Sequence, residues 1–107
     1  MSEIFRISIV IQVVRDLDAT LPVQDLHGFL YITNNPGCRV TDLQNNLGVS
    51  SASATRIVHR LGHFESKGRV GLGLITVETD KEDRRQRCLW LSTKGQKLVK
   101  RMESAMN

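Results

Sequence analysis

Residues 48–61, GVSSASATRIVHRL, constrain the fold more than any other stretch of this 107-residue chain. Either Ser50 or Ser51 can cap a helix, because a serine hydroxyl accepts hydrogen bonds from the free N–H groups of the first helical turn. The stretch therefore predicts an amphipathic helix that packs on a core through one face. That face consists of Ala54, Ile57, Val58 and Leu61, at positions i, i+3, i+4 and i+7.

The opposite face of this helix carries small, hydroxyl and basic side chains, and residues 47–64 contain no acidic residue. Small side chains let a helix approach another surface closely, while hydroxyl and guanidinium groups can hydrogen-bond base edges and phosphates. This composition is typical of a DNA-recognition helix, although an ordinary amphipathic helix that only packs has a similar pattern. The face consists of Ser51, Ala52, Ser53, Thr55, Arg56, His59 and Arg60.

A short helix is predicted directly before this stretch. Residues 41–44 fit a capping box, in which the Gln44 side chain reaches back to the backbone N–H of Thr41. Gly48 then permits a sharp turn into the next helix. Residues 41–61 are therefore predicted to be a helix-turn-helix.

A charged hairpin is predicted further along the chain. Residues 74–79 alternate apolar and polar side chains, and a second extended run ends at residue 92. The charged sequence DKEDRR lies between them. A solvated turn is the simpler interpretation of DKEDRR, but behind a helix-turn-helix the same hairpin is a wing. Residues 74–92 are accordingly predicted to be a wing, and residues 93–105 a last helix capped by Thr93.

The link between recognition helix and wing is glycine-rich. Residues 61–74 contain four glycines, so the preceding helix is expected to end near residues 66–68. The remainder of the link is either a loop or a loose first strand of the wing. A link of this length can also displace the wing or extend the recognition helix.

The first 40 residues are predicted to be mostly helical. Residues 2–18 carry a wide apolar stripe at helical spacing, although β-branched residues there also alternate as in a strand. Their length favours a helix, either a deeply buried core helix or a dimerisation helix. Residues 20–33 form a second helix capped by Thr20, and Asn35-Pro36-Gly37 ends it. Residues 38–40 are predicted to be extended. The whole chain, residues 1–107, is predicted to be one domain.

The charge distribution indicates a polyanionic partner. The first 54 residues hold three basic and five acidic residues, a net charge of −2, whereas residues 55–107 hold twelve basic and six acidic residues, a net charge of +6. A basic half beside a mildly acidic half favours binding to a polyanion on one face. Nucleic acid and a membrane surface both fit this description.

Other kinds of chemistry find little support. Cys38 and Cys88 form no disulfide framework and no Cys-x-x-Cys pair, and both are expected to be structural. His59 and His63 have i, i+4 spacing but no third ligand, so neither a metal site nor a cofactor is predicted. We see no catalytic residue set and predict no enzyme activity. The apolar run near the start is too short to span a membrane, and a cytoplasmic protein is expected.

This order of segments predicts a mainly α fold with a small β-hairpin wing (α+β), a winged helix-turn-helix, and four segments resemble the MarR family of bacterial transcription regulators. LPVQDLHGFLYITNNPG is similar to the family's second helix and the turn after it, and VTDLQNNLGVSSASATRIVHRL to its paired DNA-binding helices. DKEDRR fits the wing motif acid-x-x-Asp-Arg-Arg, and LSTKG resembles the Leu-Thr-x-x-Gly that follows it. The wing motif and its spacing to LSTKG are the most specific part.

The resemblance implies a sequence-specific regulator of double-stranded DNA, with a repressor that occludes a promoter as the expected role. In the wing, Arg85, with Arg84, would enter the minor groove, and Asp83 would steady an arginine there. Phosphate contacts would come from Lys81, Arg87 and Arg60. The residues implied to face the major groove are Ser50, Ser51, Ala52, Ser53, Thr55 and Arg56.

The resemblance also implies a homodimer. Chains of the family normally continue with further helices that pair with the first helix, whereas this sequence stops at Asn107. Dimer contacts would then come from the first and last helices, or would be rearranged or absent. The effector pocket that the family places between its dimer and DNA-binding regions would be reduced as well.

Two other functions are compatible with the same fold. A winged helix that binds proteins instead of DNA would carry acidic or bulky side chains on its recognition face, and the face predicted here carries neither. A replication or partition protein would read repeated DNA sites with the same residues as a regulator.

Overall fold

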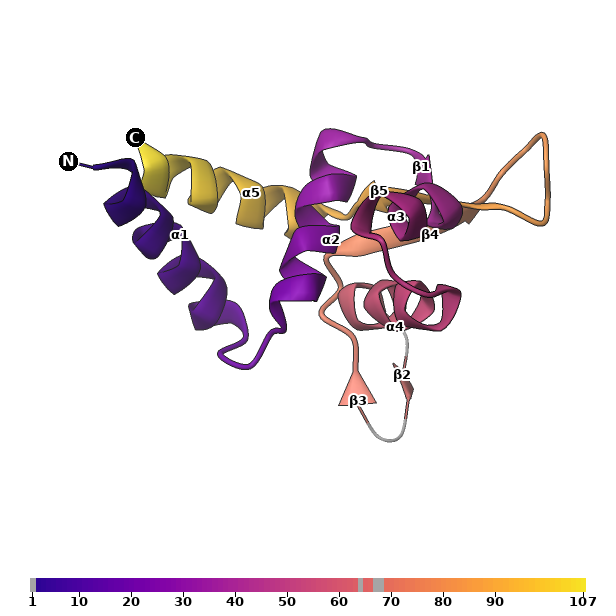
Figure 1. Cartoon of the computed structure of the whole chain (residues 1–107), viewed down its shortest axis with the longest axis horizontal. Coiled ribbons are helices and arrows are strands. Elements are labelled where there is room, and N and C mark those ends of the chain that lie inside the picture. Colours follow the sequence, from indigo (N-terminus) through magenta and orange to yellow (C-terminus); the bar gives the residue numbers. More distant parts are fainter. Residues whose placement is uncertain (1, 64, 67–68) are drawn as a thin grey trace.

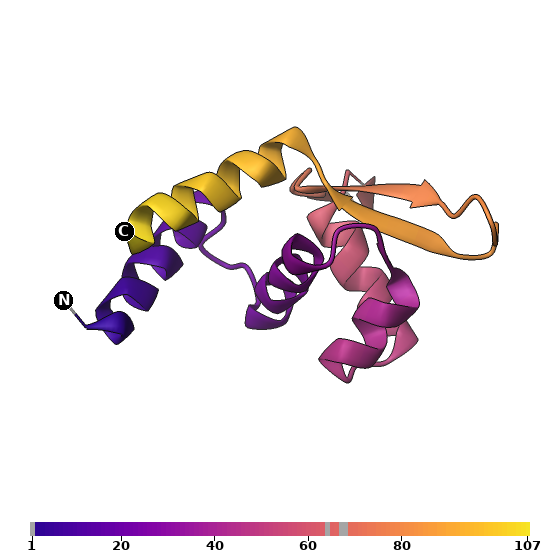
Figure 2. The same ribbon diagram turned by 90° about the horizontal axis from the view of Figure 1, so that it is seen from above.

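The computed structural model describes residues 2–63, 65–66 and 69–107. Helices α1 and α5 lie side by side at one end of the molecule, and the wing projects from the other end (Figures 1 and 2). Helices α2, α3 and α4 lie between these ends. The described helices are α1 (Glu3–Leu17), α2 (Val23–Asn34), α3 (Val40–Leu47), α4 (Ser51–Leu61) and α5 (Thr93–Met106).

The wing is a small antiparallel sheet with the strand order β1-β5-β4. β4 (Ile75–Thr79) and β5 (Arg87–Leu91) form the hairpin, with Val77 opposite Leu89. β1 (Cys38–Arg39) adds a short third strand along β5, as expected for an extended segment before α3. The predicted fold, mainly α with a small β-hairpin wing in a winged helix-turn-helix arrangement, is confirmed.

The inner face of α4 lies at the centre of the core. Its four predicted core residues are at most 3% exposed. Leu43 of α3, Leu89 of β5 and Leu98 of α5 belong to the same hydrophobic cluster. Burying apolar surface contributes about 25 cal/mol per Å², so this cluster stabilises the packing of these elements on one another.

The structure corrects three predicted helix caps. α2 begins at Val23 with Pro22 as its N-cap, and Thr20 instead hydrogen-bonds the Asp18 carboxylate through its N–H and its hydroxyl. Pro22 makes no side-chain hydrogen bond to the first turn, so α2 begins without a side-chain cap. Thr20 lies three residues before the helix, and its hydroxyl donates to Asp18 instead of accepting an N–H of the first turn.

The other two caps differ by one or two residues. α3 begins at Val40, where the Asp42 carboxylate accepts the backbone N–H of Arg39 over 2.9 Å, so the predicted Gln44-to-Thr41 pairing is wrong. α5 is capped by Ser92, whose hydroxyl oxygen accepts the N–H of Gly95 over 3.0 Å. Thr93, the predicted cap, is the first helical residue instead.

The link from α4 to the wing is a second hairpin. α4 ends at Leu61, earlier than the predicted break near residues 66–68, of which 67 and 68 lie outside the described residues. Gly62 turns the chain, and the backbone N–H groups of residues 72–74 hydrogen-bond the carbonyls of residues 60–62. β2 (Glu65–Ser66) pairs with β3 (Arg69–Val70) within the link. The recognition helix is therefore not lengthened, because the returning chain satisfies its last carbonyls.

Helix α1 resolves the ambiguity of the first segment, which is a helix rather than a strand. Ser2 caps it by accepting the N–H of Phe5, and its buried residue Val14 joins the core cluster. α1 packs against α5. Much of the apolar stripe is nevertheless exposed, so α1 is not a deeply buried core helix. The exposed side chains are Ile4, Phe5, Ile7 and Ile11.

Gly95, the glycine of the LSTKG segment, lies where α5 passes the start of the wing. A Cβ atom at this position would overlap the carbonyl oxygen of Leu74. Backbone atoms cannot yield as a flexible side chain can, so only glycine fits here. This close approach sets the distance between α5 and β4.

We predict that Gly95→Ala lowers the free energy of unfolding by about 1–3 kcal/mol because of this overlap. In an open helical position the same change would raise stability by up to about 1 kcal/mol, so the two cases differ in sign. Denaturant unfolding measures the difference. Ser104→Ala, an exposed change on α5, serves as the control, and a stabilised Gly95→Ala variant would contradict the assignment.

Candidate nucleic-acid interface

The outer face of α4 carries the predicted recognition residues, and a chain of hydrogen bonds organises them. Ser50 is the N-cap, as one of the two predicted serines, and its hydroxyl oxygen accepts the backbone N–H of Ser53 over 3.1 Å. The two hydroxyls also hydrogen-bond each other, and Arg56 donates to the Ser53 oxygen over 3.2 Å. This chain holds the exposed Arg56 guanidinium along the helix surface. Ser51, Ala52 and Thr55 are exposed beside it.

The wing tip is built around two aspartates. Asp80 accepts the backbone N–H of Glu82 over 2.9 Å and forms an ion pair with Arg39 of β1 over 2.7 Å. The Glu82 N–H and the Arg39 guanidinium together hold the pKa of the Asp80 carboxyl below its ordinary value. Because Arg39 directly precedes α3, this ion pair joins the wing to the helix-turn-helix.

The second aspartate, Asp83, holds the wing arginine. Its carboxylate accepts the backbone N–H of Arg85 over 3.1 Å and the Nε of the same residue over 3.3 Å. The Arg85 side chain is nevertheless 91% exposed. Asp83 thus orients the guanidinium of Arg85 through its Nε, and the rest of the group is open to a ligand. Lys81, Arg84 and Arg87 are exposed on the same hairpin.

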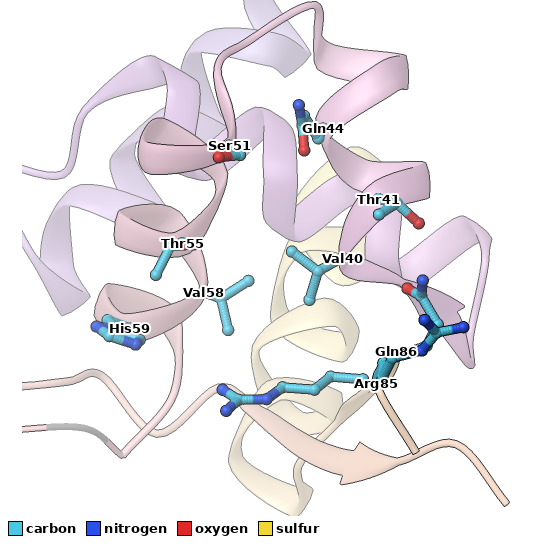
Figure 3. A pocket seen from close by; sticks show the side chains of 10 residues that line it. Val40, Thr41, Gln44, Ser51, Thr55, Val58, His59, Arg85 and Gln86 are labelled. Carbon is cyan, nitrogen blue, oxygen red and sulfur yellow. The ribbon is translucent and has the colours of Figure 1, made fainter. Parts of the chain in front are cut away.

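A hollow of about 540 Å³ separates the recognition helix from the wing. Figure 3 shows it lined by α3, by α4 and by Arg85 and Gln86 of the wing, just before β5. Of the predicted contact residues, Ser51, Thr55, Arg85 and Arg87 lie on it together. The structure thus brings two segments 30 residues apart in the sequence to one open, polar concavity.

Sequence reasoning missed part of this lining. Thr41 and Gln44 of α3 face the hollow, and so does His59 of α4. The positions of Thr41 and Gln44 within the helix-turn-helix could have indicated them. Polar residues on the part of the first helix that the second helix leaves uncovered lie beside the recognition face. For His59 the sequence signal was its place on the polar face.

A second, smaller hollow of about 190 Å³ lies on the other side of α4, against the start of α2. Ser53 and Arg56 line it, so these predicted residues do not share the first hollow. Arg60 lies here too and donates from Nη1 to Asp25 Oδ2 over 2.8 Å. Burial raises the pKa of Asp25, an effect that Arg60 partly offsets.

The described residues offer no sign of other chemistry. They contain no group of three or more His, Cys, Asp or Glu side chains that could hold a metal ion. Burial raises the pKa of the Cys38 thiol to about 11, so it stays protonated at neutral pH and is a poor nucleophile. Among the described helices, none is long and apolar enough to cross a membrane.

Comparisons with solved structures show the same fold. The transcriptional regulator Tm0710 from Thermotoga maritima matches with a TM-score of 0.71 and 25% identity, over 89% of this chain and 60% of its own. A MarR transcriptional regulator from Methanosarcina mazei Go1 matches with a TM-score of 0.71 and 16% identity, over 91% of this chain and 63% of its own. The chain thus spans less than two thirds of the length of either regulator.

A DNA-bound structure is among the matches. The complex of MepR from S. aureus with DNA matches with a TM-score of 0.74 and 20% identity, over 97% of this chain and 82% of that one. A comparison with curated protein sequences found no match. The sequence model of the MarR family, whose members are transcription regulators and not enzymes, matches residues 21–86, from before α2 to the wing tip. Since this match spans more than half of the chain, the protein belongs to the MarR family.

Proposed function

We propose that this protein is a sequence-specific regulator of transcription that binds double-stranded DNA, with α4 in the major groove and Arg85 of the wing in the minor groove. The observation that carries the proposal is the hollow between α4 and the wing, which is polar, open and lined from both sides by residues able to contact DNA. An α-helix fits the major groove of B-form DNA, and a wing beside it reaches the adjacent backbone and minor groove. The MepR–DNA complex shows a protein of this fold on DNA.

The proposed contacts follow the exposed side chains. Arg56 reads a base edge, because Ser53 holds its guanidinium on the outer face of α4. Lys81 and Arg87 contact phosphates around the wing, Arg84 enters the minor groove with Arg85, and Asp83 keeps Arg85 in position. The other proposed major-groove residues are Ser50, Ser51, Ala52, Ser53 and Thr55.

A protein-binding winged helix is the alternative, and the composition of α4 supports DNA instead. None of the strongly exposed large apolar side chains in the described part of the chain lies on α4. Protein interfaces usually have a desolvated apolar centre, and an arginine-bearing polar face suits phosphate and base contacts better.

We further propose that the protein is a repressor that occludes a promoter and that it acts in the cytoplasm.

The exposed side of α1 supports a homodimer. Ile4, Phe5, Ile7 and Ile11 are 40–76% exposed, and Met106 of the adjoining α5 is 51% exposed. The start of α1 and the end of α5 lie close together at this end (Figure 1). An apolar patch of this kind is usually covered in solution. A second copy related by two-fold symmetry would cover it and present two recognition helices to a pseudo-palindromic site.

Selection of duplexes from a random pool, followed by titration across a salt series, tests the proposal. We expect one sequence to be enriched and to be bound more tightly than its scrambled version. The affinity should fall linearly on a log–log plot against salt concentration, because phosphate contacts release counterions. The mass of the free protein, measured in parallel, should be that of a dimer. Absence of any enriched sequence would favour the protein-binding alternative.

We predict that Arg56→Ala weakens binding to the selected duplex by about 1–3 kcal/mol and leaves binding to random DNA nearly unchanged, because a bidentate base contact is lost. Arg101→Ala, an exposed arginine on α5, is the matched control. Equal losses on both duplexes would make Arg56 a phosphate contact. Unchanged binding to both would remove it from the interface.

We predict that Arg85→Ala weakens binding most where the sequences flanking the selected site are AT-rich. A narrow AT-rich minor groove has the most negative potential and attracts an inserted arginine most strongly. Titrations with AT-rich and GC-rich flanks, again beside Arg101→Ala, measure the difference. If both flanks give the same loss, the assignment of the wing to the minor groove is wrong.

A further inference from the structure

We propose that Asp25 of α2 is a positioning and specificity-determining residue for DNA recognition. By binding Arg60 it holds α4 at its crossing angle with α2, and it keeps the Arg60 guanidinium away from DNA phosphates. The inference rests on the proposed function, and it replaces the predicted phosphate contact of Arg60 with a different role.

Two contacts at the crossing of α2 and α4 bear on this role, one steric and one electrostatic. At Gly28 the helices approach so closely that a Cβ atom would lie 2.9 Å from the Cγ2 of Ile57. Asp25 lies three residues before Gly28 on α2, and Arg60 lies three residues after Ile57 on α4. The ion pair is therefore about one helical turn from the steric contact on both helices. Two separated contacts fix rotation as well as position, which a single contact does not.

The pair is poorly suited to provide stability alone. Asp25 is 4% exposed and is the one buried charged side chain in the described part of the chain. Burial of a carboxylate costs free energy that its partner only offsets, and an apolar pair of similar volume is often as stable. What an ion pair provides in addition is direction, since its 2.8 Å hydrogen bond forms only while this face of α4 lies beside Asp25.

The pair also lies at the edge of the recognition face. Arg60 follows Arg56 by one turn of α4, and Asp25 lines the same small hollow as these two arginines and Ser53. The Arg60 side chain is 42% exposed, so without Asp25 it could turn towards a bound phosphate. A guanidinium bound to a carboxylate adds little to sequence-independent attraction for DNA. Asp25 thus suppresses binding to random DNA while it aligns the residues that read sequence.

The variant Asp25→Asn separates this proposal from simple electrostatics. Removing a negative charge beside a polyanion would by itself strengthen binding to every duplex. We expect instead that binding to the selected duplex weakens by at least about fivefold, within the range measured for coupled neighbouring residues. Binding to random DNA should be equal or tighter, with a salt slope about one unit steeper because Arg60 is released.

Asp16→Asn is the matched control, because Asp16 is an exposed carboxylate on α1 that accepts a hydrogen bond from Gln12. It changes the net charge equally and should leave the discrimination between the two duplexes as it is in the wild type. If Asp25→Asn binds the selected duplex as tightly as Asp16→Asn does, the inference is overturned.

Arg60→Gln tests the pair from its other side and does not depend on the folding of Asp25→Asn. We expect a similar loss on the selected duplex, with the salt slope on random DNA unchanged. A slope about one unit shallower on both duplexes would make Arg60 a phosphate contact and overturn the inference. Thermal melting establishes that each titration is done on folded protein. A wild type without sequence preference would overturn the proposed function as well, whereas a preference unaffected by either variant overturns only the inference.

Discussion

Burial of one face of α4 is the constraint on which the rest of the structure depends. Ala54, Ile57 and Leu61 are at most 2% exposed, and helices α2 and α3, the wing and α5 contribute to the cluster that covers them. Once the inner face is covered in this way, the polar face can only point to solvent. The candidate recognition surface is thus a consequence of packing on the opposite side of the same helix.

Charged pairs give this packing its orientation. The Arg39–Asp80 pair joins the wing to the start of α3, and the Asp25–Arg60 pair joins α2 to the end of α4. The first is partly exposed to solvent through Arg39, which screens it and leaves it little contribution to the free energy of folding. Both connect elements that must keep a set angle if one is to lie in the major groove while the other reaches the minor groove. Their contribution is therefore to geometry more than to stability.

The accuracy of prediction from sequence depended on how local each interaction is. The periodicity of α4 and the alternation of β4 were confirmed, because each pattern reflects a single buried face. Helix caps were wrong by one or two residues at Thr20, Thr41 and Thr93. Several side chains near each start can satisfy the same free N–H groups, and small differences in backbone angle decide among them. The early end of α4 was missed because its last carbonyls are satisfied by residues 72–74.

The amino-acid sequence alone determined the family, the order of elements and the composition of the recognition face, since these follow from patterns within single segments. Only the tertiary structure decided which segments meet. Asp25 and Arg60 are 35 residues apart, and no local pattern links them. Likewise, only the packing of α1 on α5 showed that Ile4 and Ile7 remain exposed. Such contacts depend on the angles at which helices cross, and those angles arise from the packing of many side chains at once.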